Sequence, residues 1–129
     1  MRYLGIDYGA KRMGMAVADR ETGIAIPRGV MARENDAAAI GKIIAMIGDE
    51  RIGRVIIGLP LAHDGSETGE SREVRAFAQI LEEKISVPVE FENEMFTTRM
   101  ATHKGVRKED IDAASAAIIL QSYLDRRKG

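Results

Sequence analysis

Apolar residues alternate with small or polar ones over the first part of the chain, and this pattern predicts strands. Residues 1–7 are rich in apolar side chains, residues 13–18 alternate large and small, and residues 24–30 form a third short apolar stretch. A period of two is typical of strands. Turn signals at residues 7–11 (DYGAK) and 22–23 separate the three stretches. The pattern therefore predicts three sequential strands in an antiparallel meander.

The spacing of apolar residues then changes to that of a helix. Asn35 or Asp36 can cap the start of this helix, and Gly48 closes it. The isoleucines that recur at the spacing of a buried helical face are Ile40, Ile43, Ile44 and Ile47.

Strands and helices alternate over the next part of the chain. Residues 54–58 are a short apolar run, as expected of a strand covered on both faces, and the polar residues 61–68 predict a loop. Residues 87–91 predict a fifth strand, and Pro88 places it near an edge of the sheet because proline cannot donate to a ladder. Between them lies a second amphipathic helix, which we expect to bury Val74, Phe77, Ala78 and Leu81.

Two helical segments are predicted at the end of the chain. Thr97 or Thr98 can cap a short helical turn that runs to His103, and Gly105 breaks it. A last helix covers residues 108–125 and has an unusually small face. Because strand-helix-strand units enforce parallel crossovers, the order of elements predicts an α/β fold. Its mixed sheet has five strands, three antiparallel and then two parallel, and is flanked by helices.

The composition narrows the class of protein. The length of 129 residues favours one domain over residues 1–129. The absence of cysteine excludes a disulfide framework and a thiolate zinc site. No apolar run approaches the length of a membrane span, and residues 1–5 lack the apolar stretch of a secretory signal. We therefore expect a cytoplasmic protein that does not associate with membranes.

The charges are unevenly placed, although the net charge is only −1. Residues 1–33 carry a net charge of +3, residues 34–96 carry −7, and residues 97–129 carry +3. If the two ends of the chain lie side by side, they form a basic face that suits a polyanionic ligand. A plain solvated surface is the alternative.

Three acidic residues stand at positions that suggest chemistry. Asp7 ends an apolar strand, where an unpaired buried carboxylate is costly. Glu94 lies just past the fifth predicted strand, and strand ends are common sites in α/β sheets. Asp112 falls on the apolar face of the last helix, which also carries Ser115, Ala116, Ile119 and Tyr123.

Each of these acids also has a purely structural interpretation. Asp7 can form a turn before Gly9, Asp112 can cap its helix, and Glu94 can be ordinary surface. If the three converge instead, their oxygen atoms suit Mg²⁺ or Mn²⁺. A pair of such ions stabilises the attacking and leaving oxygens of phosphodiester hydrolysis.

Four segments, in order, match the pattern of a known family. They are residues 5–16 (GIDYGAKRMGMA), residues 58–60 (GLP) with Gly65, residues 93–98 (NEMFTT) and residues 112–124 (DAASAAIILQSYL). Together they resemble the YqgF/RuvX family, described as Holliday junction resolvase-like and as nucleases of pre-16S rRNA. The first motif alone is also similar to the opening of sugar kinases and actin-like ATPases, whereas the four together are specific. The match spans essentially the whole chain.

The resemblance implies a ribonuclease H-like fold in which Asp7, Glu94 and Asp112 are catalytic and hold Mg²⁺ or Mn²⁺. The third motif differs from the family pattern at Asn93 and Met95, which replace an Asp and an Arg, while Glu94 is retained. The residues that the resemblance and the basic ends favour as substrate contacts are Lys11, Arg12, Thr97, Thr98, Arg99 and Lys104.

The activity that the resemblance implies is metal-dependent endonucleolytic cleavage of structured nucleic acid, with the 5′ region of precursor 16S rRNA as the first substrate. Resolution of branched DNA junctions is the runner-up. Junction resolution needs a dimer, but no long apolar seam is evident, so we expect a monomer or weak homodimer. Asn93 and Met95 favour a third alternative, a non-catalytic RNA-binding module.

Two further interpretations are disfavoured. An ATP-binding domain of the actin or sugar kinase type places its nucleotide between two domains, and this chain is long enough for one. His63 and His103 lie in predicted polar segments without a second ligand at helical spacing, so we do not expect either to act as a catalytic base.

Overall fold

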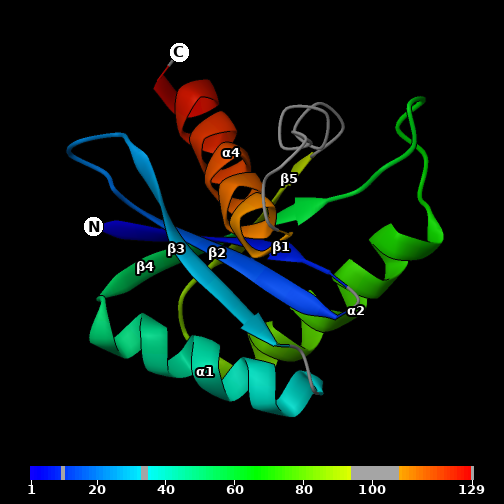
Figure 1. Ribbon diagram of the computed structural model, residues 1–129, viewed down its shortest axis with the longest axis horizontal. Helices are drawn as coiled ribbons and strands as arrows, with labels where there is room; N and C mark the ends of the chain where they lie inside the picture. The colour runs from blue at the N-terminus through cyan, green and yellow to red at the C-terminus, as the bar shows by residue number, and fades with distance from the viewer. Residues whose placement is uncertain (10, 33–34, 94–107, 129) are drawn as a thin grey trace.

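A five-stranded sheet forms the middle layer of the molecule (Figure 1). The computed structural model describes residues 1–9, 11–32, 35–93 and 108–128. The strands lie in the order β3-β2-β1-β4-β5, where β1–β2 and β2–β3 are antiparallel and β1–β4 and β4–β5 are parallel. This arrangement confirms the predicted mixed sheet. The strands are β1 (Arg2–Tyr8), β2 (Arg12–Asp19), β3 (Ala25–Ala32), β4 (Ile52–Leu59) and β5 (Val89–Asn93).

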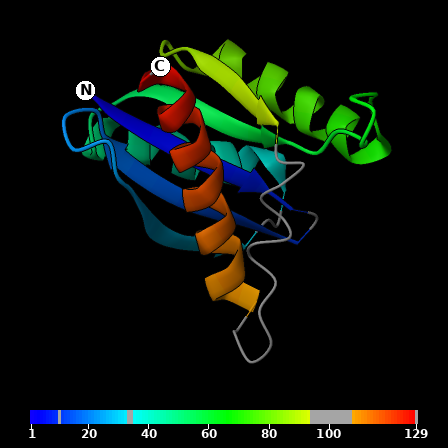
Figure 2. The ribbon, with the colours of Figure 1, turned by 90° about the horizontal axis from the view of Figure 1, so that it is seen from above.

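Helices cover both faces of the sheet. The helices α1 (Asp36–Asp49) and α2 (Gly69–Lys84) pack on one face, and α4 (Lys108–Lys128) crosses the other (Figure 2). Alternate residues of each strand enter the two cores: Leu4 and Ile6 of β1 lie under α1 and α2, whereas Tyr3 lies under α4. The strand β4 contributes to both cores, as predicted for a strand covered on both faces.

The first helix forms as predicted, but one isoleucine of its predicted buried face is exposed and another, Ile47, is only partly buried. The side chain of Asn35 caps α1 by accepting a hydrogen bond from the Ala38 N–H at 2.8 Å. Ile40 and Ile43 are buried, but Ile44 is 42% exposed, so its predicted burial is wrong. The buried stripe is centred on Ile43, and the next residue lies about 100° further around a helix.

The second helix and the fifth strand are displaced little from their predicted positions. The side chains of Thr68 and Ser71 form a capping box at the start of α2. β5 begins at Val89, two residues later than predicted, and it is an edge strand as expected. The short helical turn predicted for residues 97–103 lies outside the described residues. The predicted buried face of α2 is confirmed at Val74, Phe77, Ala78 and Leu81.

The backbone of α4 lies very close to the sheet because glycines face it. A Cβ atom at Gly14 would be only 1.9 Å from the carbonyl oxygen of Asp112, and one at Gly5 would be 2.8 Å from the Cβ of Leu120. The side chain of Gln121 then ties the helix to the β2–β3 turn, because it accepts from the Ala25 N–H and donates to a backbone carbonyl. These contacts fix α4 on β1 and β2.

The two ends of the chain lie side by side, because α4 packs on β1, β2 and β3 (Figure 2). Residues 108–128 alone carry no net charge, and the cations that make the C-terminal segment basic, Arg99, Lys104 and Arg107, lie outside the described residues. Among the described helices, none is both long and apolar enough to cross a membrane.

Candidate active site

Asp7 and Asp112 are brought together by strand register and by the close approach of α4. Asp7 lies on the same face of β1 as Tyr3, which packs beneath α4. In the β1–β2 ladder Asp7 pairs with Gly14, and Gly14 lies directly against the backbone of Asp112. The fold therefore places at one point two of the three acids that the sequence singled out.

The carboxyl group of Asp7 is in an unfavourable environment for a negative charge. Burial, and secondly the charge of Asp112, raise the pKa of Asp7 from 3.8 to about 6. No described side chain donates a hydrogen bond to it. A carboxylate that is buried and repelled by another acid is costly to the fold and suited to binding a cation.

Asp112 has a cationic partner. The Nε–H of Arg12, at the start of β2, donates to Oδ2 of Asp112 at 3.0 Å, and both side chains are about one third exposed. One guanidinium therefore offsets part of the charge of the two acids. The helical face predicted for Asp112 is also confirmed, because its other members, Ser115, Ala116, Ile119 and Tyr123, are all buried.

The raised pKa of Asp7 predicts how stability depends on pH. The folded protein binds the proton of the Asp7 carboxyl group more tightly than the unfolded chain does. Protonated Asp7 therefore contributes its full stabilisation of the fold below about pH 4, and this contribution is lost as the pH rises through about 6. Relative to the parent, Asp7→Asn should therefore gain up to about 3 kcal/mol in its free energy of unfolding between pH 4 and pH 8. Urea unfolding at several pH values without divalent cations measures this gain. A gain independent of pH would contradict it.

The third predicted carboxylate cannot be placed beside this pair. Glu94 lies outside the described residues, as do Thr97, Thr98, Arg99 and Lys104. Among the residues that the structure does describe, no three His, Cys, Asp or Glu side chains form a group able to hold a metal ion. Of the predicted substrate contacts, Lys11 is exposed beside the β1–β2 turn and Arg12 pairs with Asp112.

The sequence analysis missed the role of Glu92. The residue is 4% exposed, and its side chain faces α4, where it accepts from the Ser122 hydroxyl at 2.7 Å and from the guanidinium of Arg126. A buried carboxylate with several donors holds its partners firmly. The end of β5, two residues before Glu94, is thus fixed to α4.

A second acid of β5, Glu90, joins the same two elements. It accepts from the Tyr123 hydroxyl and lies 2.8 Å from nitrogens of both Arg54 and Arg127. Burial opposes the ionised form, but the hydroxyl and the two guanidinium groups outweigh it, and the pKa of Glu90 is lowered. The alternation of two acids on an edge strand, opposite a helix end rich in Ser, Tyr and Arg, was the available signal.

Comparisons with known sequences agree with the motifs. A family model described as "RuvX: Holliday junction resolvase" matches residues 1–126. A protein of Maridesulfovibrio salexigens is 35% identical, covering 98% of this chain and 99% of its own length. A protein of Anaplasma marginale is 40% identical, covering 99% of this chain and 87% of its own length. Both carry the name "Putative pre-16S rRNA nuclease".

Two solved structures of Holliday junction-binding proteins share this arrangement of elements. The Thermus thermophilus RuvC structure in complex with a Holliday junction substrate has a TM-score of 0.60 at 17% identity, covering 100% of this chain and 97% of that one. The Fowlpox virus resolvase in complex with Holliday junction DNA has a TM-score of 0.62 at 10% identity, covering all of both chains. At these identities the likeness shows the fold alone, and it confirms the predicted ribonuclease H-like architecture.

Proposed function

This chain belongs to the RuvX family, and from that premise we propose that it is a metal-dependent endonuclease that hydrolyses phosphodiesters of structured nucleic acid. The names of its relatives favour precursor 16S rRNA as the substrate, and we propose its 5′ region as the part that is cut. The proposal includes a cytoplasmic location, where ribosomal RNA precursors are made in bacteria.

One observation carries the proposal: Asp7 and Asp112, from opposite ends of the chain, lie together on one face of the sheet. The ladder pairs Asp7 with Gly14, and the helix backbone at Asp112 rests on that glycine. Burial, and secondly the charge of Asp112, raise the pKa of Asp7. A fold that accepts this cost gains a site at which carboxylate oxygens can bind a cation.

The donor atoms fit a hard divalent cation. Asp7 and Asp112 would hold Mg²⁺ or Mn²⁺ together with Glu94, since these ions prefer oxygen ligands. When bound, such a cation supplies Lewis-acid chemistry, acidifying water and neutralising charge on the phosphate oxygens. With a pKa of about 6, Asp7 is mostly ionised at neutral pH and so is available as a ligand.

The basic residues beside the acids suit the phosphates that flank the cleaved bond. Arg12 holds Asp112 in position and places a guanidinium next to the acids. Lys11 is exposed one residue earlier. We propose that both contact substrate, with Thr97, Thr98, Arg99 and Lys104 completing the set. Contacts to phosphates weaken as salt rises.

A cleavage assay on two substrates tests the proposal. The purified protein is incubated with precursor 16S RNA carrying its 5′ leader, and separately with a four-way DNA junction. Each substrate is tested with Mg²⁺, with Mn²⁺ and with EDTA. We expect the RNA to be cut at a defined position with a divalent cation and to remain intact in EDTA.

The same assay separates the alternatives. Cutting of the junction alone, by a protein that is dimeric in solution, would select junction resolution, which the description of the family model favours. Binding of RNA without cleavage in any metal would select an RNA-binding module. Our expectation of a monomer or weak homodimer is checked by sedimentation at the assay concentration.

A further inference from the structure

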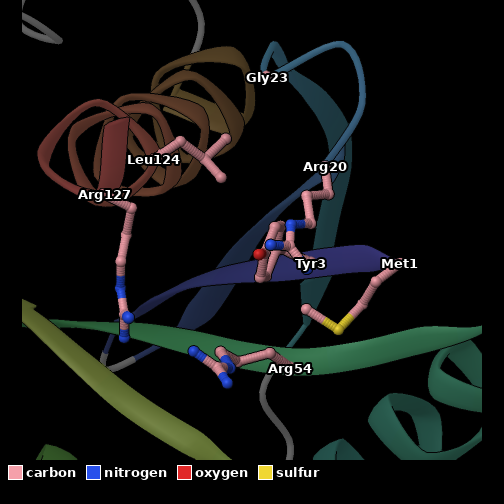
Figure 3. A pocket seen from close by; sticks show the side chains of 7 residues that line it. All are labelled: Met1, Tyr3, Arg20, Gly23, Arg54, Leu124 and Arg127. Atoms are coloured by element: carbon pink, nitrogen blue, oxygen red, sulfur yellow. The ribbon is translucent and has the colours of Figure 1, made fainter. Parts of the chain in front are cut away.

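A cavity of about 380 Å³ opens at the start of β1, away from the candidate active site (Figure 3). It is within the size range of small-molecule sites. Tyr3 lines it, and the spacing of residues in a strand puts Tyr3 about 13 Å from Asp7 along β1. The pocket is therefore separate from the acids. Its other lining residues are Met1, Arg20, Gly23, Arg54, Leu124 and Arg127.

Three arginines from three different elements line this cavity. Arg20 follows β2, Arg54 belongs to β4, and Arg127 lies in the last turn of α4. Figure 3 shows the side chains of Arg54 and Arg127 extending toward each other from the strand and the helix. None of the described residues that line the cavity is acidic. The lining is therefore strongly cationic.

The positive charge is only partly offset by neighbouring groups. Glu90 is shared, because its Oε2 lies 2.8 Å from Nη1 of Arg54 and its Oε1 lies 2.8 Å from Nη2 of Arg127. Within the described ranges, no group accepts a hydrogen bond from the guanidinium of Arg20. The positive charge of three guanidinium groups is thus only partly offset by the negative charge of one carboxylate. Arg20 and Arg127 keep donors for an anion, whereas Arg54 is already bonded to Glu90 and to the Tyr123 hydroxyl.

The walls of the cavity are held in place by hydrogen bonds. The N–H of Gly23 donates to the Asp19 carbonyl at 2.9 Å, and the Gly23 carbonyl accepts from the side chain of Gln121 at 2.9 Å. The N–H of Arg20 donates to the carbonyl of Met1, also at 2.9 Å. A pocket whose backbone is already fixed loses little freedom when a ligand binds.

We propose that this pocket binds the phosphate group of a nucleotide unit. Guanidinium groups match the geometry of phosphate oxygens with paired donors, and three of them line this cavity. The side chains of Met1, Tyr3 and Leu124 form an apolar wall that suits the sugar or base attached to that phosphate. The proposal of a phosphate site rests on the cavity alone. The phosphate belongs either to a free nucleotide or to a nucleic-acid strand, and the second of these sources rests on the proposed function.

Binding measurements in EDTA test this proposal without any cleavage. The variants are Arg20→Gln and Arg127→Gln, with Arg72→Gln as the matched control, because Arg72 is exposed on α2 at the opposite face of the sheet. The probes are adenosine monophosphate and a short RNA hairpin. Losing one charged hydrogen-bond donor should weaken binding about tenfold in each pocket variant and leave the control unchanged. Thermal unfolding verifies that each variant is folded.

The two probes distinguish the sources of the phosphate. If a strand supplies it, hairpin affinity falls and the slope of log affinity against log salt decreases by about one. If a free nucleotide supplies it, only adenosine monophosphate binding falls. The proposal is overturned if both probes bind the pocket variants as tightly as the parent, or if Arg72→Gln weakens binding equally. Because cleavage is not measured, a protein that binds but never cuts contradicts only the proposed function.

Discussion

Asp7→Asn should reduce divalent-cation-dependent cleavage by more than about 100-fold while leaving the protein folded. Substitutions that only perturb the surroundings of a metal ligand already cost 10- to 100-fold, so loss of a ligand should cost more. The amide keeps the shape of the side chain but lacks the charge that binds the cation. The measurement is the initial rate of cutting of precursor 16S RNA in Mn²⁺ and in Mg²⁺.

The effect of Asp7→Asn on stability separates catalysis from folding. Because the buried carboxylate of Asp7 is unfavourable when ionised, the variant should be at least as stable as the parent at pH 7.5. Asp49→Asn is the matched control, since Asp49 ends α1 on the other face of the sheet. It should cut at the parental rate. Unchanged cleavage by Asp7→Asn would show that Asp7 is not a catalytic residue.

The fold was predictable because most of its elements are encoded by local periodicity. The alternation over β2 separates Met15 and Val17, which enter the core under α1 and α2, from Ala16, which lies under α4. The 3.6-residue spacing located the buried face of α2. Ile44 was the exception, because spacing defines a stripe without fixing where its centre lies, and only packing against the sheet does so.

The sequence pattern could select two acids that the fold brings together, but not the partners of those acids. Asp7 and Asp112 could be selected because each places a carboxylate on an apolar face. The ion pair between Arg12 and Asp112 could not, because it joins positions 100 residues apart. The alternation of Glu90 and Glu92 along β5 was a signal in the sequence, but their pairing with groups on α4 was not. Such pairs depend on how layers are stacked, which no short sequence window contains.

The close approach of α4 to the sheet is what connects the fold to the site, and Gly14 is the residue on which it depends. A Cβ there would lie 1.9 Å from the carbonyl oxygen of Asp112, far inside van der Waals contact, so Gly14→Ala must displace the helix. We expect a loss of about 3 kcal/mol or more in the free energy of unfolding, because overpacking that moves backbone is costly. Urea unfolding measures it.

Two other glycines make this prediction a graded series. At Gly5 the nearest contact of an added Cβ is 2.8 Å, so Gly5→Ala should destabilise less than Gly14→Ala. At Gly41, on α1, nothing lies within 4 Å, and Gly41→Ala should stabilise by about 0.5–1 kcal/mol through helix propensity. Gly14→Ala should also lower cleavage about 100-fold, since moving Asp112 by 1 Å misaligns it. Parental stability in Gly14→Ala would show that this contact does not position the acids.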